Sequence, residues 1–244
     1  MILELDCGNS FIKWRLIESD AVAPRLGGIA VGVEDILLGI PDGCPITRCR
    51  MVSVRGDKET ETLLESVQAA LGVAVVRATP ARNVAGVTNG YRDFDRLGMD
   101  RWLAVVGAFH MCQTACLIID LGTAVTADIV DSAGRHLGGF IAPGIGLMRG
   151  QLLSHTRRIY YGASEAESAL ADLGPGKSTA EAVERGCIMM LRAYVNAQVE
   201  EARSLLKSDF VVYVTGGDAA LAAGLPGAQF VPDLVFRGLA VACP

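Results

Sequence analysis

Short apolar stretches alternate along this chain with longer segments in which apolar residues recur every third or fourth position. The short stretches predict strands, and the longer segments predict amphipathic helices. The strands are expected at residues 2–5, 11–17, 25–31, 48–54, 73–77, 115–119, 124–130, 136–141 and 210–214, and the helices at 57–71, 101–114 and 178–206. Because strands and helices interleave throughout, the pattern predicts an α/β fold.

The last predicted helix has the most regular apolar pattern. Its start carries a capping box, in which Ser178 is followed three positions later by Glu181. An apolar stripe at a spacing of four runs along it through Val183, Cys187, Leu191, Val195 and Val199. We interpret this stripe as part of the core or as a subunit interface, and not as a cofactor site.

A short motif occurs twice, each time between two predicted strands. The sequences are Asp6-Cys-Gly-Asn and Asp120-Leu-Gly-Thr, so both follow the pattern D-x-G-[N/T]. Asp120 comes 114 residues after Asp6, which is about half of the 244-residue chain. The repetition predicts an ancient duplication with two similar halves, residues 1–114 and 115–244.

The chemistry of this motif suits a polyphosphate. Glycine in a tight turn lets the backbone approach an anion and donate N–H groups to it. A carboxylate at the strand end would repel phosphate, but it can hold a metal ion, or water on a metal ion, that bridges to phosphate. Asn9, Ser10 and Thr123 add short polar side chains, and Lys13 on the following strand could reach the same anion. The alternative is that both motifs are ordinary hairpin turns.

A third motif, Thr215-Gly-Gly-Asp, follows the strand expected at 210–214. Its two glycines would let a flat ring such as adenine, or a ribose, lie against the backbone. A plain turn between a strand and a helix explains it equally well. The sequence GPGKST at 174–179 resembles the end of a P-loop, but Ala171 stands where that motif requires its first glycine. We interpret it as the loop that leads into the helix at 178.

Charge and cysteine content narrow the range of partners. The net charge is −5 and no basic run is present, which argues against nucleic acid and membranes as partners. There is no uncharged apolar stretch of about 18 residues, and acidic residues stand where a signal peptide would need basic and apolar ones. The seven cysteines form no CxxC pair and are odd in number, which favours reduced thiols in the cytoplasm over disulfides or a zinc site.

In this order, the motifs resemble those of the acetate and sugar kinase, heat-shock ATPase and actin superfamily, and most closely those of type III pantothenate kinases. DCGNSFIKW is similar to their first phosphate motif, DLGTAVTADIV to their second and TGGD to their adenosine motif. NGYRDFDRLGMDRW, at 89–102, resembles their substrate segment with its G-x-D-R signature, and GGFIAPGIGLM, at 138–148, is also similar to the family. The resemblance covers nearly the whole chain, and residues 19–50 are the least similar part.

The resemblance implies two similar actin-like, or ribonuclease H-like, halves, each a mixed sheet flanked by helices, with the nucleotide cleft between them. It implies ATP-dependent phosphorylation of pantothenate to 4′-phosphopantothenate, the first step of coenzyme A biosynthesis. The implied enzyme is a cytoplasmic homodimer that uses Mg²⁺ with ATP and a monovalent cation, K⁺ or NH₄⁺.

The resemblance also implies roles for single residues. Asp100 matches the general base, although an aspartate at that place could also be a helix N-cap. The implied pantothenate contacts are Tyr91, Gly98, Met99, Asp100, Arg101 and Thr179. The implied ATP and phosphate contacts are Asp6, Gly8, Asn9, Ser10, Lys13, Gly122, Thr123, Gly216 and Gly217. Asp120 matches the ligand of the monovalent cation, and Asp6 lies near Mg²⁺.

Other functions in the same superfamily are possible alternatives. A sugar kinase is the nearest enzymatic one, and an ATPase in which the nucleotide drives assembly or partner binding is another. At 244 residues the chain has no substrate-binding extension and little room for filament insertions. A non-catalytic regulatory relative is the third, but Asp100 and both hairpin motifs are intact.

Overall fold

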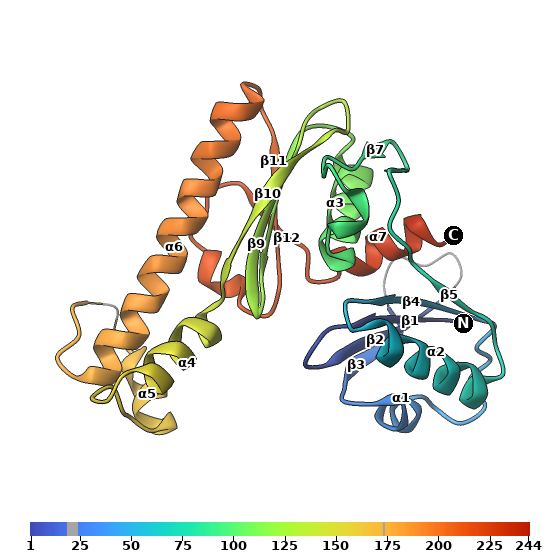
Figure 1. Ribbon diagram of the computed structural model, residues 1–244, viewed down its shortest axis with the longest axis horizontal. Coiled ribbons are helices and arrows are strands. Elements are labelled where there is room, and N and C mark those ends of the chain that lie inside the picture. The colour runs from blue at the N-terminus through green and yellow to red at the C-terminus, as the bar shows by residue number, and fades with distance from the viewer. Residues whose placement is uncertain (19–23, 173) are drawn as a thin grey trace. The chain divides into compact units, whose positions relative to one another are not determined.

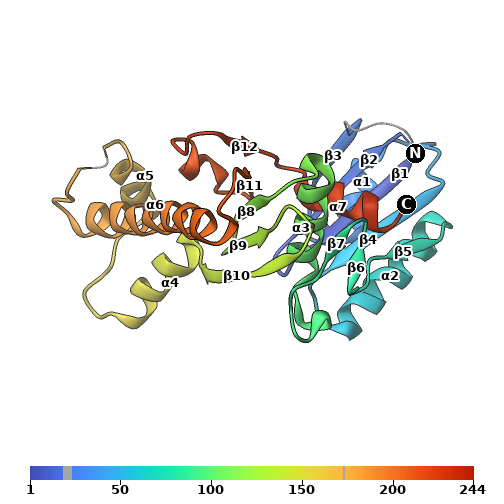
Figure 2. The same cartoon turned by 90° about the horizontal axis from the view of Figure 1, so that it is seen from above.

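Within the described residues, 1–18, 24–172 and 174–244, the computed structural model is built on two five-stranded sheets with equivalent strand orders, β3-β2-β1-β4-β5 and β10-β9-β8-β11-β12 (Figures 1 and 2). In each sheet a hairpin is antiparallel, β1–β2 or β8–β9, and its first strand pairs in parallel with β4 or β11. The first sheet consists of β1 (Ile2–Cys7), β2 (Ile12–Ile17), β3 (Leu26–Ala30), β4 (Arg48–Ser53) and β5 (Val75–Arg77). The second consists of β8 (Cys116–Leu121), β9 (Ala124–Val130), β10 (His136–Pro143), β11 (Val211–Thr215) and β12 (Ala228–Phe230).

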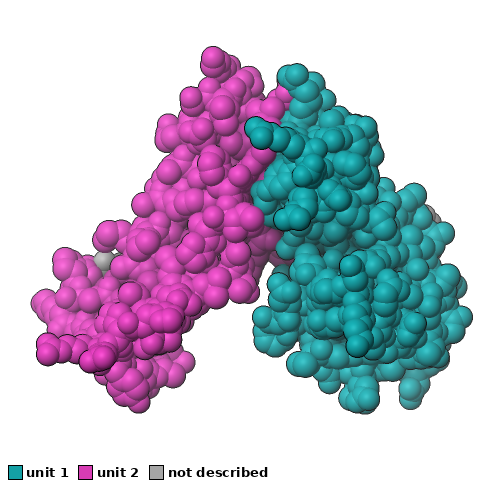
Figure 3. Space-filling view, viewed as in Figure 1, with its two compact units in different colours: residues 1–113, 133–136, 233–244 teal, residues 114–132, 137–232 magenta. Residues whose placement is uncertain are grey.

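The chain divides into two units, which Figure 3 shows in different colours. Unit 1 comprises Met1–Gln113, Ala133–His136 and Asp233–Pro244, and unit 2 comprises Thr114–Ser132 and Leu137–Pro232. Unit 1 holds the first sheet, and unit 2 holds the second apart from the first residue of β10. The predicted fold class, two mixed sheets flanked by helices, is confirmed. The predicted halves, 1–114 and 115–244, concern ancestry and stay a prediction.

In unit 1 helices lie on both faces of the sheet (Figure 1). Side chains alternate along a strand, so neighbouring residues of β1 face opposite ways. Leu3, Leu5 and Cys7 pack into one core with α1 (Val33–Gly39) and α2 (Asp57–Leu71). The other face is contacted by α3 (Met99–Cys112) and α7 (Leu234–Ala242). Glu4 and Asp6 therefore belong to the face that α3 and α7 cover.

The two helices α3 and α7 pack backbone to backbone. A Cβ atom added to Gly107 would lie 2.7 Å from the carbonyl oxygen of Leu234 and 2.8 Å from the nitrogen of Gly238. Glycine on both helices makes this close approach possible. As a result α7 is an integral part of unit 1, although it is more than 100 residues away from α3 in the sequence.

Buried ion pairs also connect α7 to the sheet. The fully buried carboxylate of Glu4 accepts hydrogen bonds from Arg15 Nε at 2.6 Å and Arg50 Nη1 at 2.9 Å. Arg15 Nη1 also donates to Asp233 Oδ2 at 2.9 Å, and Arg237 Nε donates to Asp233 Oδ1 at 2.9 Å. These bonds join three strands of the sheet to the start of the last helix.

In unit 2 the long helix α6 (Thr179–Leu206) covers one face of the sheet. The predicted stripe faces inward, since each of its five members is at most 8% exposed and Leu191, Val195 and Val199 share a core with β8, β9 and β11. The interpretation of the stripe as a subunit interface is therefore wrong, because its own chain covers it. The unit also contains α4 (Ile145–His155) and α5 (Ala163–Ala169).

The described elements agree with most of the expected ones. The helix at 57–71 and the strand at 124–130 have the expected bounds, and the remaining expected strands and helices are found with shifted ends. The pattern did not predict α1, α4, α7 or β12, and a short 3₁₀ helix (Ala219–Ala222) stands where a helix was expected after Gly217. No helix in the described part of the chain combines the length and apolar character that a membrane crossing requires.

Candidate active site

The first motif forms the loop between β1 and β2. Asp6 lies at the end of β1 and is paired with Lys13 of β2 across the hairpin. Asn9, Ser10 and Lys13 are exposed. The sequence therefore folds as predicted at this point: the loop presents short polar groups, a carboxylate and a cation at one end of the sheet.

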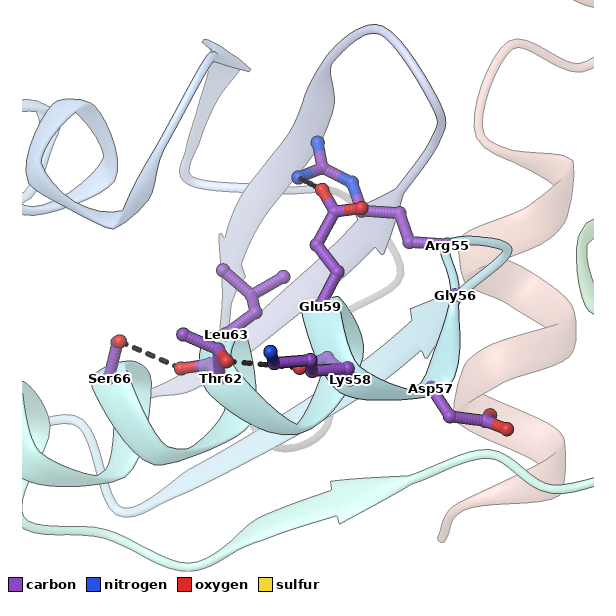
Figure 4. A pocket seen from close by; sticks show the side chains of 8 residues that line it. All are labelled: Arg55, Gly56, Asp57, Lys58, Glu59, Thr62, Leu63 and Ser66. Atoms are coloured by element: carbon purple, nitrogen blue, oxygen red, sulfur yellow. Dashed lines mark hydrogen bonds and ion pairs between the residues drawn. The ribbon is translucent and has the colours of Figure 1, made fainter.

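Arg55, which the sequence pattern did not indicate, supports this loop. Arg55 follows β4, and its Nε donates a hydrogen bond of 2.8 Å to the carbonyl oxygen of Gly8. Its Nη1 donates to Glu59 Oε1 at 2.8 Å, as Figure 4 shows. A shallow pocket of about 610 Å³ lies beside Arg55, along the first turns of α2. No local pattern indicated Arg55, because its contact with Gly8 joins residues 47 positions apart.

The Cys7 thiol, which lies within this loop motif, is unreactive. Cys7 is fully buried, and burial together with the nearby Asp6 carboxylate raises the pKa of its thiol from 9.0 to about 12. The thiol therefore stays protonated at neutral pH and is a poor nucleophile. We assign Cys7 to the core and not to the chemistry of the loop.

The predicted substrate segment is held together around Tyr91. Arg101 Nη1 donates to the Tyr91 hydroxyl at 2.8 Å, and its guanidinium lies 5.6 Å from the centre of the Tyr91 ring. The Tyr91 ring also stacks on the ring of His136, with the two centroids 6.1 Å apart. The sequence pattern does not indicate this contact, because 45 residues separate His136 from Tyr91.

Two further residues give the segment its shape. Arg82 Nη1 donates to the carbonyl oxygens of Asn89 at 3.3 Å and Tyr91 at 2.9 Å. The buried Asn89 accepts a hydrogen bond from the Tyr91 backbone at 3.0 Å and donates to the Phe94 carbonyl at 3.2 Å. The loop that the sequence left without structure is therefore fixed by its own polar side chains.

Asp100 lies in the first turn of α3. The helix begins at Met99 with Gly98 at its N-cap, so the alternative interpretation of Asp100 as the N-cap residue is wrong. The Oδ1 of Asp100 accepts a hydrogen bond from the Arg101 backbone at 2.8 Å. A Cβ atom on Gly98 would lie 2.8 Å from the same Oδ1, so a larger residue at that place would crowd the carboxylate.

The second motif forms the loop between β8 and β9 in unit 2. Asp120 ends the strand as Asp6 does, and Gly122 makes the tight turn, with its nitrogen donating to the Ala124 carbonyl at 3.2 Å. The Thr123 carbonyl accepts a hydrogen bond from Gly144 at 3.0 Å, which brings the loop before α4 to the same place. Gly122 and Thr123 thus occupy a loop of defined shape.

The third motif lies against the second. Thr215 of β11 is paired with Asp120 of β8, and the Asp218 nitrogen donates to the Leu121 carbonyl at 2.8 Å. Gly216 has a φ of +95°, and a Cβ atom there would overlap the Asp120 carboxylate and the Leu121 carbonyl. The backbone at position 216 therefore requires glycine. A Cβ atom on Gly217 would meet no atom within 4 Å, so only this second glycine borders open space.

Thr179 belongs to a different unit from the other predicted substrate residues. It is the first residue of α6 in unit 2, whereas Tyr91 and residues 98–101 belong to unit 1. One half of the predicted capping box is present, since the Ser178 side chain accepts a hydrogen bond from the Glu181 backbone at 3.3 Å. The Glu181 side chain accepts from the Lys177 backbone at 2.6 Å and not from Ser178. Thr179 itself is exposed at the start of the helix.

A buried carboxylate on α6 was also missed. Glu184 is fully buried and accepts hydrogen bonds from Arg149 of α4 and from the Tyr161 hydroxyl at 2.7 Å. Burial and this bond raise the pKa of Tyr161 to about 12, and the bond to Glu184 raises the pKa of Arg149. The three side chains fasten α4 and the segment before α5 to α6.

The described residues contain no group of three or more histidine, cysteine or acidic side chains that could hold a metal ion by themselves. The loops instead offer one carboxylate each, Asp6 and Asp120. A single carboxylate of this kind fits a divalent ion that is held mainly by nucleotide phosphates and water, as Mg²⁺ often is.

Comparison with known proteins identifies relatives along the whole chain. The family model of type III pantothenate kinases matches residues 2–201. A type III pantothenate kinase of Pseudomonas savastanoi pv. phaseolicola is 58% identical, covering 100% of this chain and 99% of that protein. The corresponding protein of Ectopseudomonas mendocina is 56% identical with the same coverage.

Solved structures share the fold at low identity. A protein of Campylobacter jejuni described as a Baf family transcriptional activator is 20% identical, with a TM-score of 0.64, covering 98% of this chain and 96% of that one. A ROK family glucokinase of Streptomyces griseus, in complex with glucose and AMPPNP, is 13% identical, with a TM-score of 0.51 and coverage of 99% and 97%. At these identities the two structures support the fold alone.

Proposed function

This chain belongs to the type III pantothenate kinase family, and from that premise we propose that it transfers the γ-phosphoryl group of ATP to the primary hydroxyl of pantothenate. The products are 4′-phosphopantothenate and ADP, and the reaction is the first step of coenzyme A biosynthesis. The observation that carries the proposal is the 58% identity over the full chain. The geometry of Asp100 and its neighbours supports it.

In this proposal Asp100 is the general base. The pantothenate hydroxyl oxygen attacks the γ-phosphorus, the bond from that phosphorus to the bridging oxygen of ADP breaks, and the hydroxyl proton passes to Asp100. Phosphoryl transfer needs positioning and charge stabilisation more than covalent help, so a carboxylate that orients the hydroxyl is sufficient. The hydrogen bond from the Arg101 backbone at 2.8 Å would hold one oxygen of Asp100 and leave the other to the substrate.

The proposed pantothenate contacts are the residues that surround this base. Tyr91 and Arg101 form one hydrogen-bonded pair, and a change in either would disturb the other. Gly98 and Met99 supply the turn into α3, and Thr179 is proposed as a further contact from unit 2.

Kinases of this family use ATP with a divalent metal ion, and we propose that the ion is Mg²⁺, close to Asp6. The proposed phosphate contacts in unit 1 are Gly8, Asn9, Ser10 and Lys13. Those in unit 2 are Gly122 and Thr123, with Gly216 and Gly217 near the adenosine. We propose Asp120 as the ligand of a monovalent cation, K⁺ or NH₄⁺, because Asp120 and the Leu121 carbonyl both offer oxygen to the same place beside Gly216.

The Asp100→Asn variant tests the proposed function. Asparagine keeps the shape and can still accept the hydrogen bond from Arg101, but it cannot take up the proton. A positioned base typically contributes about 10²–10⁴-fold, so we expect turnover to fall at least about 10²-fold while ATP affinity and thermal stability stay near wild type. The measurement is kcat for pantothenate and the ATP dissociation constant on one preparation.

The matched control is Asp95→Asn, which removes an exposed carboxylate from the same segment. It should leave turnover unchanged. Near-normal turnover in Asp100→Asn would remove that residue from the mechanism. A wild-type protein that turns over glucose or N-acetylglucosamine faster than pantothenate would instead favour the sugar kinase alternative.

We also propose a homodimer, with a different surface from the stripe on α6. Unit 2 exposes apolar side chains on its edge strand β10, on α4, of which no residue is buried, and on the outer side of α6. They are Leu137, Phe140, Ile141, Leu147, Leu152, Met189 and Met190. Exposed apolar side chains of this kind are typical of subunit interfaces. A second copy is the proposed occupant, because the resemblance to type III pantothenate kinases implies a homodimer with the pantothenate pocket near the subunit boundary, Thr179 included.

Sedimentation at micromolar concentration tests the dimer. The Ile141→Asp variant should dissociate it, because this side chain is 64% exposed on the edge strand. Leu38→Asp is the control, since Leu38 is 86% exposed in unit 1. A fully active wild-type monomer would contradict the proposal. We further propose a cytoplasmic enzyme without nucleic acid or membrane partners, which its seven free thiols and acidic net charge support.

A further inference from the structure

The loop between β1 and β2 is held from behind by a charged side chain. Arg55 Nε donates to the Gly8 carbonyl oxygen at 2.8 Å. The Arg55 side chain is only 11% exposed, so this hydrogen bond is largely shielded from water. A hydrogen bond shielded from water is stronger than one at the surface.

Arg55 is itself held in position. Its backbone nitrogen donates to Ser53 Oγ at 3.2 Å, and its carbonyl accepts a hydrogen bond from Thr60 Oγ1 at 3.3 Å. Its Nη1 is directed to Glu59 on the first turn of α2, as Figure 4 shows. The guanidinium therefore has little freedom to leave Gly8, and α2 and β4 fix the place of the loop through it.

The contact has a consequence for the next backbone amide. A trans peptide unit is planar, and its C=O and N–H groups point in opposite directions. Because Arg55 holds the Gly8 carbonyl on one side, the N–H of Asn9 must point to the other side, away from Arg55. This N–H is a donor of the kind that binds phosphate oxygens in glycine-containing loops.

We propose that Arg55 is a positioning residue for ATP, which directs the Asn9 N–H toward a phosphate oxygen by holding the Gly8 carbonyl. The inference rests on the proposed function, because it takes the β1–β2 loop as a phosphate site. It assigns the effect of Arg55 to one hydrogen bond through Nε and not to its charge.

Two substitutions separate the hydrogen bond from the charge. In Arg55→Gln the amide nitrogen Nε2 stands at the same place along the side chain as Nε of arginine, so a donor to Gly8 remains while the charge is lost. Arg55→Met has similar length but no donor. If the bond to Gly8 matters, the Gln variant should behave like wild type and the Met variant should not.

The experiment measures the dissociation constant of a non-hydrolysable ATP analogue with Mg²⁺ by calorimetry, together with KM for ATP and for pantothenate. We expect Arg55→Met to weaken nucleotide binding about tenfold, the effect of one hydrogen bond, and Arg55→Gln to stay within about twofold of wild type. KM for pantothenate should change in neither variant. Equal weakening in both variants would overturn the proposal in favour of charge, and wild-type affinity in both would leave Arg55 without a role.

Arg77→Met is the matched control. Arg77 also forms an ion pair with α2, through Glu61 at 3.0 Å, but it has no contact with the loop among the described hydrogen bonds. It should leave nucleotide affinity unchanged. If Arg55→Met fails to fold in a thermal melt, weakened binding in Arg55→Gln alone still overturns the proposal. A wild-type protein that does not bind the analogue at all would contradict the proposed function, which is a separate outcome.

Discussion

The β1–β2 loop of unit 1 and the β8–β9 loop of unit 2 follow the same motif but are supported by different means. In unit 1 a long side chain, Arg55, reaches the loop from beyond β4 and binds the Gly8 carbonyl. In unit 2 the backbone after β11 comes so close that only glycine fits at position 216, directly against Asp120. The segment after the central parallel strand thus reaches the loop with an arginine side chain in unit 1 and with a closely packed glycine in unit 2.

The strands that lead into the two loops differ in the same way. Two residues before the motif carboxylate stands Glu4 in β1 and Ile118 in β8. Glu4 is paired with Arg15 and Arg50 on the neighbouring strands, whereas Ile118 is an ordinary buried apolar residue. The two units therefore share strand order and the loop motif but differ in the interactions beneath each loop.

The largest difference between the units is expected in the stability lost on substitution at these two buried positions, Glu4 and Ile118. Glu4→Gln removes the negative partner of the buried Arg50 guanidinium and leaves Arg15 with Asp233 alone, and we expect a loss of about 3–5 kcal/mol in the free energy of unfolding. Ile118→Val in unit 2 should cost only about 0.5–1.5 kcal/mol. Both tryptophans, Trp14 and Trp102, belong to unit 1, so urea unfolding followed by fluorescence reports on that unit.

Far-UV circular dichroism, followed in the same titrations, reports on both units. A Glu4→Gln loss below about 1 kcal/mol would show that the ion pairs contribute little net stability, as at an exposed surface.

The next difference concerns the loop glycines. Gly216→Ala combines a positive φ with atomic overlap, and we expect it to lower the free energy of unfolding by about 2–4 kcal/mol. Gly8→Ala places its Cβ 3.2 Å from the Phe11 carbonyl, a tight but adjustable contact, so the expected loss is below about 1 kcal/mol. Gly224→Ala, whose Cβ meets nothing within 4 Å, is the stability control for unit 2. Equal losses at positions 8 and 216 would mean that the two loops are equally confined.

A smaller difference is expected in the response to ions. If Asp120 binds the monovalent cation, Asp120→Ala should lose about a tenfold stimulation by K⁺ over Na⁺, equivalent to about 1.4 kcal/mol. Asp6→Ala should lower the rate but keep the ratio between the two ions. Initial rates with ATP, Mg²⁺ and either salt at constant ionic strength provide the measurement. An unchanged K⁺ response in Asp120→Ala would remove the cation from that loop.

The smallest difference should appear at alkaline pH. The residue between the carboxylate and the glycine is Cys7 in unit 1 and Leu121, which does not titrate, in unit 2. Burial raises the pKa of Cys7 from 9.0 to about 12 in the fold, so its contribution to stability is full below about pH 9 and is lost as pH rises toward 12. The fluorescence-detected urea midpoint should decrease when the pH is raised from about 8 to about 10.5. The decrease should be smaller in the Cys7→Ala variant. An equal fall in both proteins would assign the effect to other groups.

The sequence predicted the parts of the fold in which local pattern and packing agree. The helix Asp57–Leu71 has one apolar face and a glycine after its end, and both signals coincide with its bounds. The helix Ile145–His155 could not be predicted, because its apolar residues have no single face and none of them is buried. The short helix Leu234–Ala242 is apolar nearly all round, a pattern that does not distinguish a helix from a buried strand.

The candidate site was predictable only where it is continuous in sequence. The motifs at Asp6, Asp120 and Gly216 are each a few residues long, so their pattern is visible in the chain. Arg55 and His136 were missed because their contacts with Gly8 and Tyr91 are made by folding across 45 or more positions. Tertiary contacts of this kind leave no periodic trace in a single sequence.

The place of α7 in unit 1 has a consequence for how the chain is made. The strands of the first sheet leave the ribosome early, but the helix that packs on Glu4 and Arg15 through Asp233 is the last element in the sequence. Synthesis proceeds at about 5–20 residues per second, so Asp233 is added on the order of ten seconds or more after the charged residues of β1 and β2. The sheet of unit 2 has all its strands before then, so the half that is synthesised second is able to finish folding first.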